Sequence, residues 1–88
     1  MFVGKEQLLT KSTERLAVEA AFRENFPLFT GEISDDLSAA DVTGWDSFAH
    51  VNLMFSIEGI IDRSFDVSET FALANIGELI RYLESVES

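Results

Sequence analysis

The sequence predicts an all-α fold, a small helical bundle of three main helices plus one short helix. Three stretches carry helical periodicity or a run of strong helix formers, and each has start or stop residues at its ends. No stretch alternates apolar and polar residues as a half-buried strand does, and there is no internal repeat. An apolar content of 47% in 88 residues suits one small domain with a single core.

The first helix is expected from Thr13 to just before Pro27. The run 14–22 is rich in strong helix formers, and proline pushes the residue before it out of helical geometry. We expect a broad apolar stripe on this helix, formed by Leu16, Ala17, Ala20, Ala21 and Phe22. Residues 1–12 show no clear periodicity, so they are either an N-terminal extension or the start of this helix, and residues 13–88 form a single domain.

A long connection is expected over residues 28–46. It is rich in the turn residues Gly, Ser and Asp, and its regularly placed apolar residues can pin it to a core. Those apolar residues are Leu28, Phe29, Ile33, Leu37 and Val42. A connection of this length usually has a function or hides a short helix, although an ordinary linker is the alternative.

The second helix is expected from about Ser47 to Ile61, and it has two apolar faces. At about 100° per residue, one face is predicted to enter the core. Its members are Leu53, Met54, Ile57, Ile60 and Ile61. The opposite face carries Phe48, Val51, Asn52 and Phe55. A small domain needs only the first face for its core, so the second is a candidate partner surface, unless the first helix or the long loop covers it.

A short helical turn is expected over residues 68–72, followed by the final helix. Asn75 is a good N-cap, and Glu78 stands three residues later, where a capping box places its acid. The apolar residues that follow have the i, i+3, i+4, i+7 spacing of an amphipathic helix, which should end near Val86. They are Ile76, Leu79, Ile80 and Leu83, and Leu73 is expected to pack beside this helix.

The net charge of -10 is unevenly distributed along the chain. Between Arg23 and Arg63 there is no Lys or Arg, whereas eight acids lie there. Such a field repels nucleic acid and anionic lipid and steers encounters towards basic protein surfaces, although it also serves as a solubilising surface. We therefore expect protein partners, with neither nucleic acid nor a membrane among them.

Composition also argues against a metal site or a secreted protein. There is no cysteine, so disulfides and thiolate ligands are excluded. Asp35, Asp36 and Asp41 lack the glycine and the bidentate glutamate of a calcium loop, so no metal site is expected. No apolar run approaches the ~20 residues of a membrane span, and the first residues lack the pattern of a signal peptide. A cytoplasmic location is the expectation.

The stretch from Gly44 to Leu53 predicts a turn that runs straight into a helix. Gly44 supplies backbone freedom, and the carboxylate of Asp46 can accept from amides of the first helical turn. Ser47 then stands where those amides point outward and the helix dipole is positive, so its hydroxyl could carry a phosphate ester. The plainer alternative is an ordinary serine at a helix start.

Two further residues near this serine, His50 and Trp45, have more than one interpretation. The only histidine, His50, lies one turn after Ser47, but a glycine-flanked nucleophile on a strand–turn–helix elbow is missing, so we do not expect an enzyme. His50 should face the core, with its ring bonded to a loop carbonyl. Trp45 could anchor the loop by burial or shield a group attached to the serine; anchoring is favoured because a buried indole contributes much to a small core.

The run Gly-Trp-Asp-Ser-Phe-Ala-His-Val-Asn-Leu over residues 44–53, followed by Ser-Ile-Glu at 56–58, resembles the Asp-Ser-Leu motif of the acyl carrier protein family. It is most similar to members that read Gly-Trp-Asp-Ser-Leu before a His-Val-Asn-Leu-like run. The resemblance covers roughly residues 13–86, which makes 13–88 a single carrier domain with an acyl-carrier-like bundle. Its long loop between the first and second helices would deliver the serine.

This resemblance implies that Ser47 carries covalent 4'-phosphopantetheine, with Asp46 as the helix N-cap beside it. The thiol of the arm would hold an acyl thioester. Partners would be a phosphopantetheinyl transferase and acyl-loading and acyl-processing enzymes, docking on Phe48, Val51, Asn52 and Phe55. Leu53 and Ile57 would line part of an acyl cleft, and we expect a monomer.

The chain departs from the family pattern in two ways. Phe48 replaces the usual aliphatic residue after the serine, and Ala49, Asn52 and Gly59 stand where carriers of fatty acid synthesis generally place acids. We therefore expect a specialised fatty acid, polyketide or related pathway. A peptidyl (aminoacyl) carrier, or an unmodified acidic helical protein-interaction module, remains an alternative.

Overall fold

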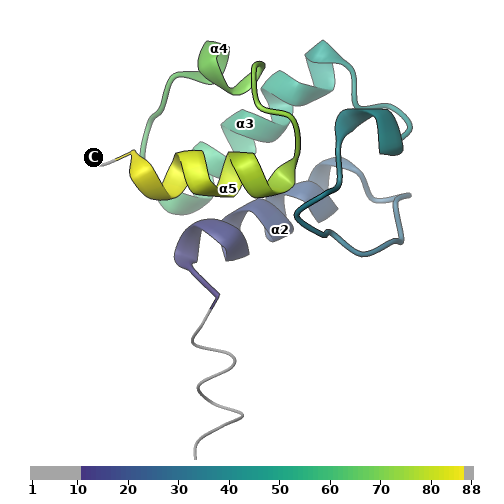
Figure 1. The fold of residues 1–88 in the computed structure, drawn as a ribbon, viewed down its shortest axis with the longest axis horizontal. Helices are drawn as coiled ribbons and strands as arrows, with labels where there is room; N and C mark the ends of the chain where they lie inside the picture. Colours follow the sequence, from purple (N-terminus) through teal and green to yellow (C-terminus); the bar gives the residue numbers. More distant parts are fainter. Residues whose placement is uncertain (1–10, 87–88) are drawn as a thin grey trace, which may run out of the picture.

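The computed structural model describes residues 11–86, which form an all-α fold without strands (Figure 1). Within this range the helices are α2 (Thr13–Asn25), the 3-10 helix η1 (Ala39–Asp41), α3 (Ser47–Ile61), α4 (Val67–Thr70) and α5 (Ile76–Ser85). The prediction of three main helices plus a short one is confirmed. Residues 1–10 lie outside the described part. The choice between an N-terminal extension and the start of the first helix can therefore be judged only at Lys11 and Ser12, which both precede α2.

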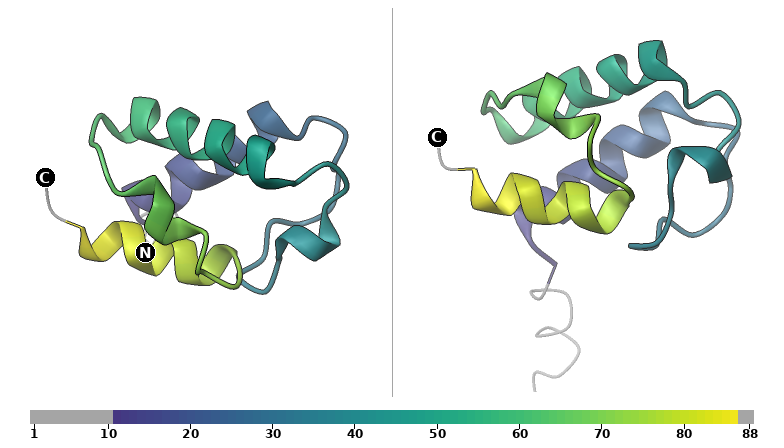
Figure 2. Two further views of the ribbon diagram at one scale, coloured as in Figure 1. Left: turned by 90° about the horizontal axis from the view of Figure 1, so that it is seen from above. Right: turned by 45° about the horizontal axis from the view of Figure 1, so that its top comes forward.

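Helix α2 packs against both α3 and α5. It runs in one direction while α3 and α5 run back in roughly the other, as both views in Figure 2 show. The core fills the space between these three helices. Its largest fully buried side chains are Phe22, Leu53, Met54, Ile57, Ile76, Leu83, Val18 and Thr70.

Helix α2 begins and ends as the sequence predicts, but its buried face is rotated. The Ser12 hydroxyl accepts from the Arg15 amide at 3.1 Å, and the helix stops at Asn25, before Pro27. The prediction that Leu16 and Ala20 belong to the buried stripe is wrong: both lie outside it, and Leu16 is 50% exposed. The buried residues are Ala17, Val18, Ala21 and Phe22. These form two adjacent lines of i, i+4 neighbours, and the line through Leu16 and Ala20 lies one step of about 100° outside them.

Helix α3 buries Leu53, Met54 and Ile57 completely. The prediction that Ile60 belongs to the same buried face is wrong, because its side chain is 48% exposed. Ile60 lies in the last turn of α3. The first turn of α2 meets this end of α3 through the ion pair between Glu14 and Arg63.

The long loop is held to the core near its middle and end. Leu37 and Val42 are buried and Phe29 and Ile33 partly so, whereas Leu28 is 93% exposed and does not pin the loop as expected. The loop contains a short helix, η1, which is one of the alternatives for a connection of this length. The carbonyls of Leu37 and Asp35 accept from the amides of Ile76 and Gly77, each at 2.9 Å. The loop thereby satisfies the first amides of α5, which have no partner within the helix.

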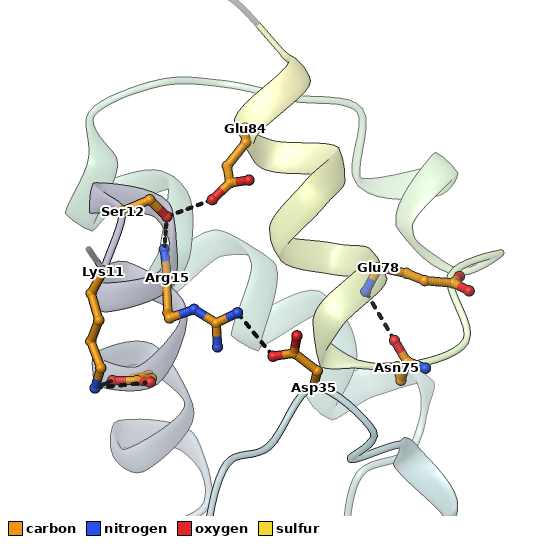
Figure 3. A network of polar contacts seen from close by, with 8 residues as sticks. Lys11, Ser12, Arg15, Asp35, Asn75, Glu78 and Glu84 are labelled. Carbon is orange, nitrogen blue, oxygen red and sulfur yellow. Dashed lines mark hydrogen bonds and ion pairs between the residues drawn. The ribbon is translucent and has the colours of Figure 1, made fainter. Parts of the chain in front are cut away.

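Polar contacts fasten the helix ends to one another (Figure 3). Ser12 donates to Glu84 at 2.6 Å, which joins the start of α2 to the end of α5. Arg15 pairs with Asp35 of the long loop at 2.9 Å. The first contact joins α2 to α5, and the second holds the loop beside α2.

The start of α5 departs slightly from a standard capping box. Asn75 caps the helix by accepting from the Glu78 amide at 2.9 Å, as predicted. The Glu78 carboxylate, however, reaches one residue further back and accepts from the amide of Ala74 at 2.8 Å. The short α4 begins slightly earlier than expected, because Asp66 caps it.

Candidate functional site

The candidate site is the start of α3, where Ser47 is the first helical residue. Gly44 adopts a φ of +90°, a conformation that favours glycine, and turns the chain into the helix. Asp46 is extended, and its carboxylate accepts from the amide of Ala49 at 2.9 Å. The Ser47 side chain is exposed. The predicted turn, cap and helix start are thus all present in the order expected.

The environment of the Ser47 hydroxyl suits an esterified phosphate. It lies at the positive end of the α3 dipole, where amides of the first turn point away from the helix. Asp46 satisfies only that of Ala49. Nothing in residues 11–86 buries Ser47.

A cavity of about 220 Å³ lies beside Ser47. One wall comes from the start of α3 and the residues before it, and the other from α4, the α4–α5 connection and α5. The lining residues are Ala39, Trp45, Asp46, Ser47, His50, Thr70, Phe71, Leu73, Ala74, Asn75 and Leu79. Most of these are apolar or aromatic, so the cavity suits a small organic group more than an ion.

Leu53 and Ile57, predicted to line an acyl cleft, are elsewhere. Both are fully buried in the core, and neither contributes to the wall of the cavity beside Ser47. Sequence reasoning missed the opposite wall, especially Phe71 and Ala74. No periodicity could have placed them, because α4 has only four residues and its position is set by tertiary contacts.

His50 is held on both ring nitrogens. The indole Nε1 of Trp45 donates to Nδ1 at 3.2 Å, and Nε2 is 2.8 Å from the hydroxyl oxygen of Thr70. The predicted bond to a loop carbonyl is therefore wrong in its partner. The Thr70 hydroxyl stands between, and it donates to the carbonyl of Val67 at 2.6 Å. Neither nitrogen bonds Ser47, so these two residues do not form a nucleophile–base pair.

Aromatic packing fixes Trp45 and His50 beside the cavity. The Trp45 ring lies 5.7 Å from both Phe22 and Phe26, so it anchors the loop to the core. The His50 ring is nearly parallel to that of Trp45, with an interplanar angle of 14°, and lies 4.4 Å from the Phe71 ring. Burial lowers the pKa of His50, because desolvation disfavours the imidazolium.

The residues predicted to bind partners lie along the outer face of α3. Phe48 is 77% exposed and Phe55 is 57% exposed, with Asn52 exposed and Val51 partly buried. No segment of residues 11–86 covers the two phenyl rings. The structure thus brings an uncovered aromatic pair onto the helix that starts with Ser47.

From Lys11 to Val86, no three His, Asp or Glu side chains converge to hold an ion. None of the helices in that range has the length and apolar character needed to cross a bilayer.

Compared with protein-family models, curated proteins and solved structures, the chain matches none of them.

Proposed function

We propose that this chain is an acyl carrier protein. Ser47 carries 4'-phosphopantetheine as a phosphate ester, and the thiol of the arm holds an acyl intermediate as a thioester. The carrier moves that intermediate between enzymes, in a specialised fatty acid, polyketide or related pathway. The observation that carries this proposal is an exposed serine at the first residue of α3, directly after its capping Asp46 and beside an apolar cavity.

In this proposal the chain itself contributes no catalytic group to its modification. A phosphopantetheinyl transferase would deprotonate the Ser47 hydroxyl, which would attack the pantetheine phosphate of coenzyme A and release 3',5'-ADP. This chain supplies an accessible hydroxyl and a helix terminus that favours negative charge. The two engaged nitrogens of His50 support a carrying role over catalysis by this chain.

The cavity gives the arm or its cargo a place to rest. A cavity of roughly 150 Å³ holds a benzene molecule, so one of about 220 Å³ accommodates a somewhat larger group. A longer acyl chain would need the space now filled by Leu53 and Ile57. Reaching it requires the helices to separate, which a small, marginally stable bundle permits.

Docking on enzymes would use the outer face of α3. Phe48 and Phe55 offer apolar contact, while Val51 and Asn52 lie between them on the same helix. The acids between Arg23 and Arg63 would steer the carrier to basic surfaces. Weak and brief complexes suit a protein that must leave one enzyme to reach the next.

The proposal is tested by mass spectrometry of the intact protein. Incubation with a phosphopantetheinyl transferase and coenzyme A should add the mass of one phosphopantetheine group, and Ser47→Ala should abolish the addition. Ser68→Ala is the matched control, because Ser68 is also an exposed serine in a first helical turn close to a capping aspartate. An unmodified wild type, or full modification of Ser47→Ala, would refute the proposal.

A second candidate is an interaction module that uses the same aromatic face without an arm. The exposure of Phe48 and Phe55 supports this candidate as much as the carrier, since both functions need a partner surface. The mass measurement separates the two. If the arm is added, loading assays with acyl and aminoacyl donors then distinguish an acyl carrier from a peptidyl carrier.

A further inference from the structure

The hydrogen bonds through His50 run in one direction only. An indole N–H is a donor and cannot accept, so the Nδ1 atom that faces Trp45 must be free of a proton. The neutral ring then carries its proton on Nε2 and donates it to the oxygen of Thr70. Thr70 in turn donates to the carbonyl of Val67. The chain from Trp45 to Val67 is complete only with a neutral His50 in this tautomer.

This chain of hydrogen bonds fastens α4 to α3. On α4 the contact is made by Thr70, which is 1% exposed. Its hydroxyl accepts the hydrogen bond from His50 of α3. On its other side α4 is held to α5 by Tyr82, whose hydroxyl donates to Glu69 at 2.8 Å. Helix α4 is one turn long and depends on these contacts, because a single turn is not stable alone.

The same residues form the wall of the cavity beside Ser47. Trp45, His50 and Thr70 all line it, and Phe71, the residue after Thr70, packs on the imidazole. A change in the position of α4 therefore changes the size and the opening of this cavity.

We propose that His50 is a proton-sensitive latch that holds α4 over the cavity beside Ser47. When Nδ1 takes up a proton from solvent, its new N–H faces the indole N–H, and two donors cannot bond each other. The contact with Trp45 is lost, the charged ring moves towards water, and Thr70 loses its donor. Helix α4 then moves away from α3 and the cavity widens.

Among residues 11–86, no carboxylate pairs with His50 to hold the charged ring where the neutral one lies. The acids on the elements around the cavity are bonded to other groups: Asp41 to Ser38, Asp46 to Ala49, Asp66 to Ser68, Glu69 to Tyr82 and Glu78 to Ala74. From α2 the contacts to Trp45 are the apolar rings of Phe22 and Phe26. An imidazolium at this position would therefore lack a counter-ion, which favours its release.

The latch itself is independent of the proposed carrier function, and only its consequence for an arm or cargo rests on that function. The latch is therefore tested on the Ser47→Ala chain, which cannot be modified, whereas modification is tested by the mass of the wild type. Failure of the latch and failure of the carrier function are then separate results.

The chain contains one Trp and one His, so NMR can follow both rings without ambiguity. Well above the ordinary histidine pKa of about 6.5, the ¹⁵N shifts should show a bare Nδ1 and a protonated Nε2. On acidification, protonation of His50 should coincide with a loss of protection of the Trp45 indole proton, by about tenfold relative to a free indole at the same pH, for the loss of one hydrogen bond. The amides of Thr70 and Phe71 should shift in the same transition.

Two variants separate the latch from a general loss of structure. Thr70→Val should leave the Trp45–His50 contact pH-dependent but remove the part of the α4 amide response that passes through the Thr70 hydroxyl. Tyr82→Phe is the matched control, because it removes the other clasp of α4 and should leave the His50 transition in place. A proton on Nδ1 at high pH, or protonation of His50 without a response at Thr70 and Phe71 in the wild-type fold, would overturn the proposal.

Discussion

Two glycines, one just before α3 and one inside it, have opposite relations to their backbone. Gly44 has open space where a Cβ would stand, but its φ of +90° strains any residue with a side chain. Gly59 lies inside α3 with a normal helical backbone, is exposed, and would also meet nothing if it gained a Cβ. The backbone at Gly44 therefore requires glycine, whereas the helix at Gly59 does not.

We predict that alanine at these two positions changes stability in opposite directions. Gly44→Ala should lower the free energy of unfolding by about 1–2 kcal/mol, the cost of a left-handed backbone for an L-residue. Gly59→Ala should raise it by about 1 kcal/mol, because alanine restricts the unfolded chain and favours helix. Urea unfolding followed by Trp45 fluorescence measures both. Equal signs for the two variants would contradict this interpretation of the backbone.

At the scale of the element, the first turn of α5 depends on the long loop. The amide of Gly77 bonds the Asp35 carbonyl at 2.9 Å, and a Cβ on Gly77 would lie 2.9 Å from the Cβ of Asp35. This close approach leaves no room for a side chain. With a larger residue at position 77, the loop carbonyls could not approach closely enough to bond the first amides of α5.

We therefore expect Gly77→Ala to destabilise the fold although alanine favours helix. The overlap with Asp35 should cost about 1–3 kcal/mol, as overpacking in a filled site does, against a gain of about 1 kcal/mol from propensity. Gly59→Ala provides the control for propensity alone. Thermal unfolding by circular dichroism would compare them, and a Gly77→Ala chain as stable as Gly59→Ala would show that the loop yields easily.

The helices and the serine were predictable because their signals are local. Ser12, Asp46 and Asn75 cap the three main helices, and each acts on amides within its own first turn. The buried face of α2 and the exposure of Ile60 were not predictable in this way. They depend on which lines of a helix its neighbours cover, and periodicity alone leaves that rotation open by about one residue.

The candidate site also has one part that local sequence predicts and one part that it does not. Ser47 and its cap follow from adjacent residues, but the cavity also needs Phe71 and Ala74, which are distant in the sequence. The bond between His50 and Thr70 connects the two walls, and it joins residues on different helices. The local sequence of α4 does not predict that contact.

At the scale of the whole molecule, Arg63 ties three parts of the chain together. Its guanidinium pairs with Glu14 at the start of α2 and donates to the carbonyl of Val86 after α5 at 3.3 Å. Both side chains of the pair are largely shielded, with 22% and 16% of their surface exposed. The hydrogen bond from Arg63 holds the pKa of Glu14 below its ordinary value. The pair therefore stabilises the fold above the ordinary pKa of glutamate, and this contribution is lost as the pH falls through the lowered pKa.

We predict that Glu14→Gln lowers the free energy of unfolding at neutral pH by about 1–3 kcal/mol, the range for hydrogen bonds to charged groups. The difference from wild type should shrink as the pH falls through the pKa of Glu14, because the wild type then loses its own pair. Glu19→Gln is the matched control. Its partner Lys11 is 48% exposed, and an exposed pair should contribute less than about 1 kcal/mol. Equal losses for the two variants would count against a special role for Arg63.

The bonds from the loop carbonyls of Asp35 and Leu37 to α5 also bear on the order of assembly. Residues distant along the chain must meet before the last helix has its opening turn complete. A nascent chain would thus finish α5 late, after its middle has docked, so the closing step of folding is a long-range event. A peptide comprising only the C-terminal third would lack that template and should remain largely coil in water.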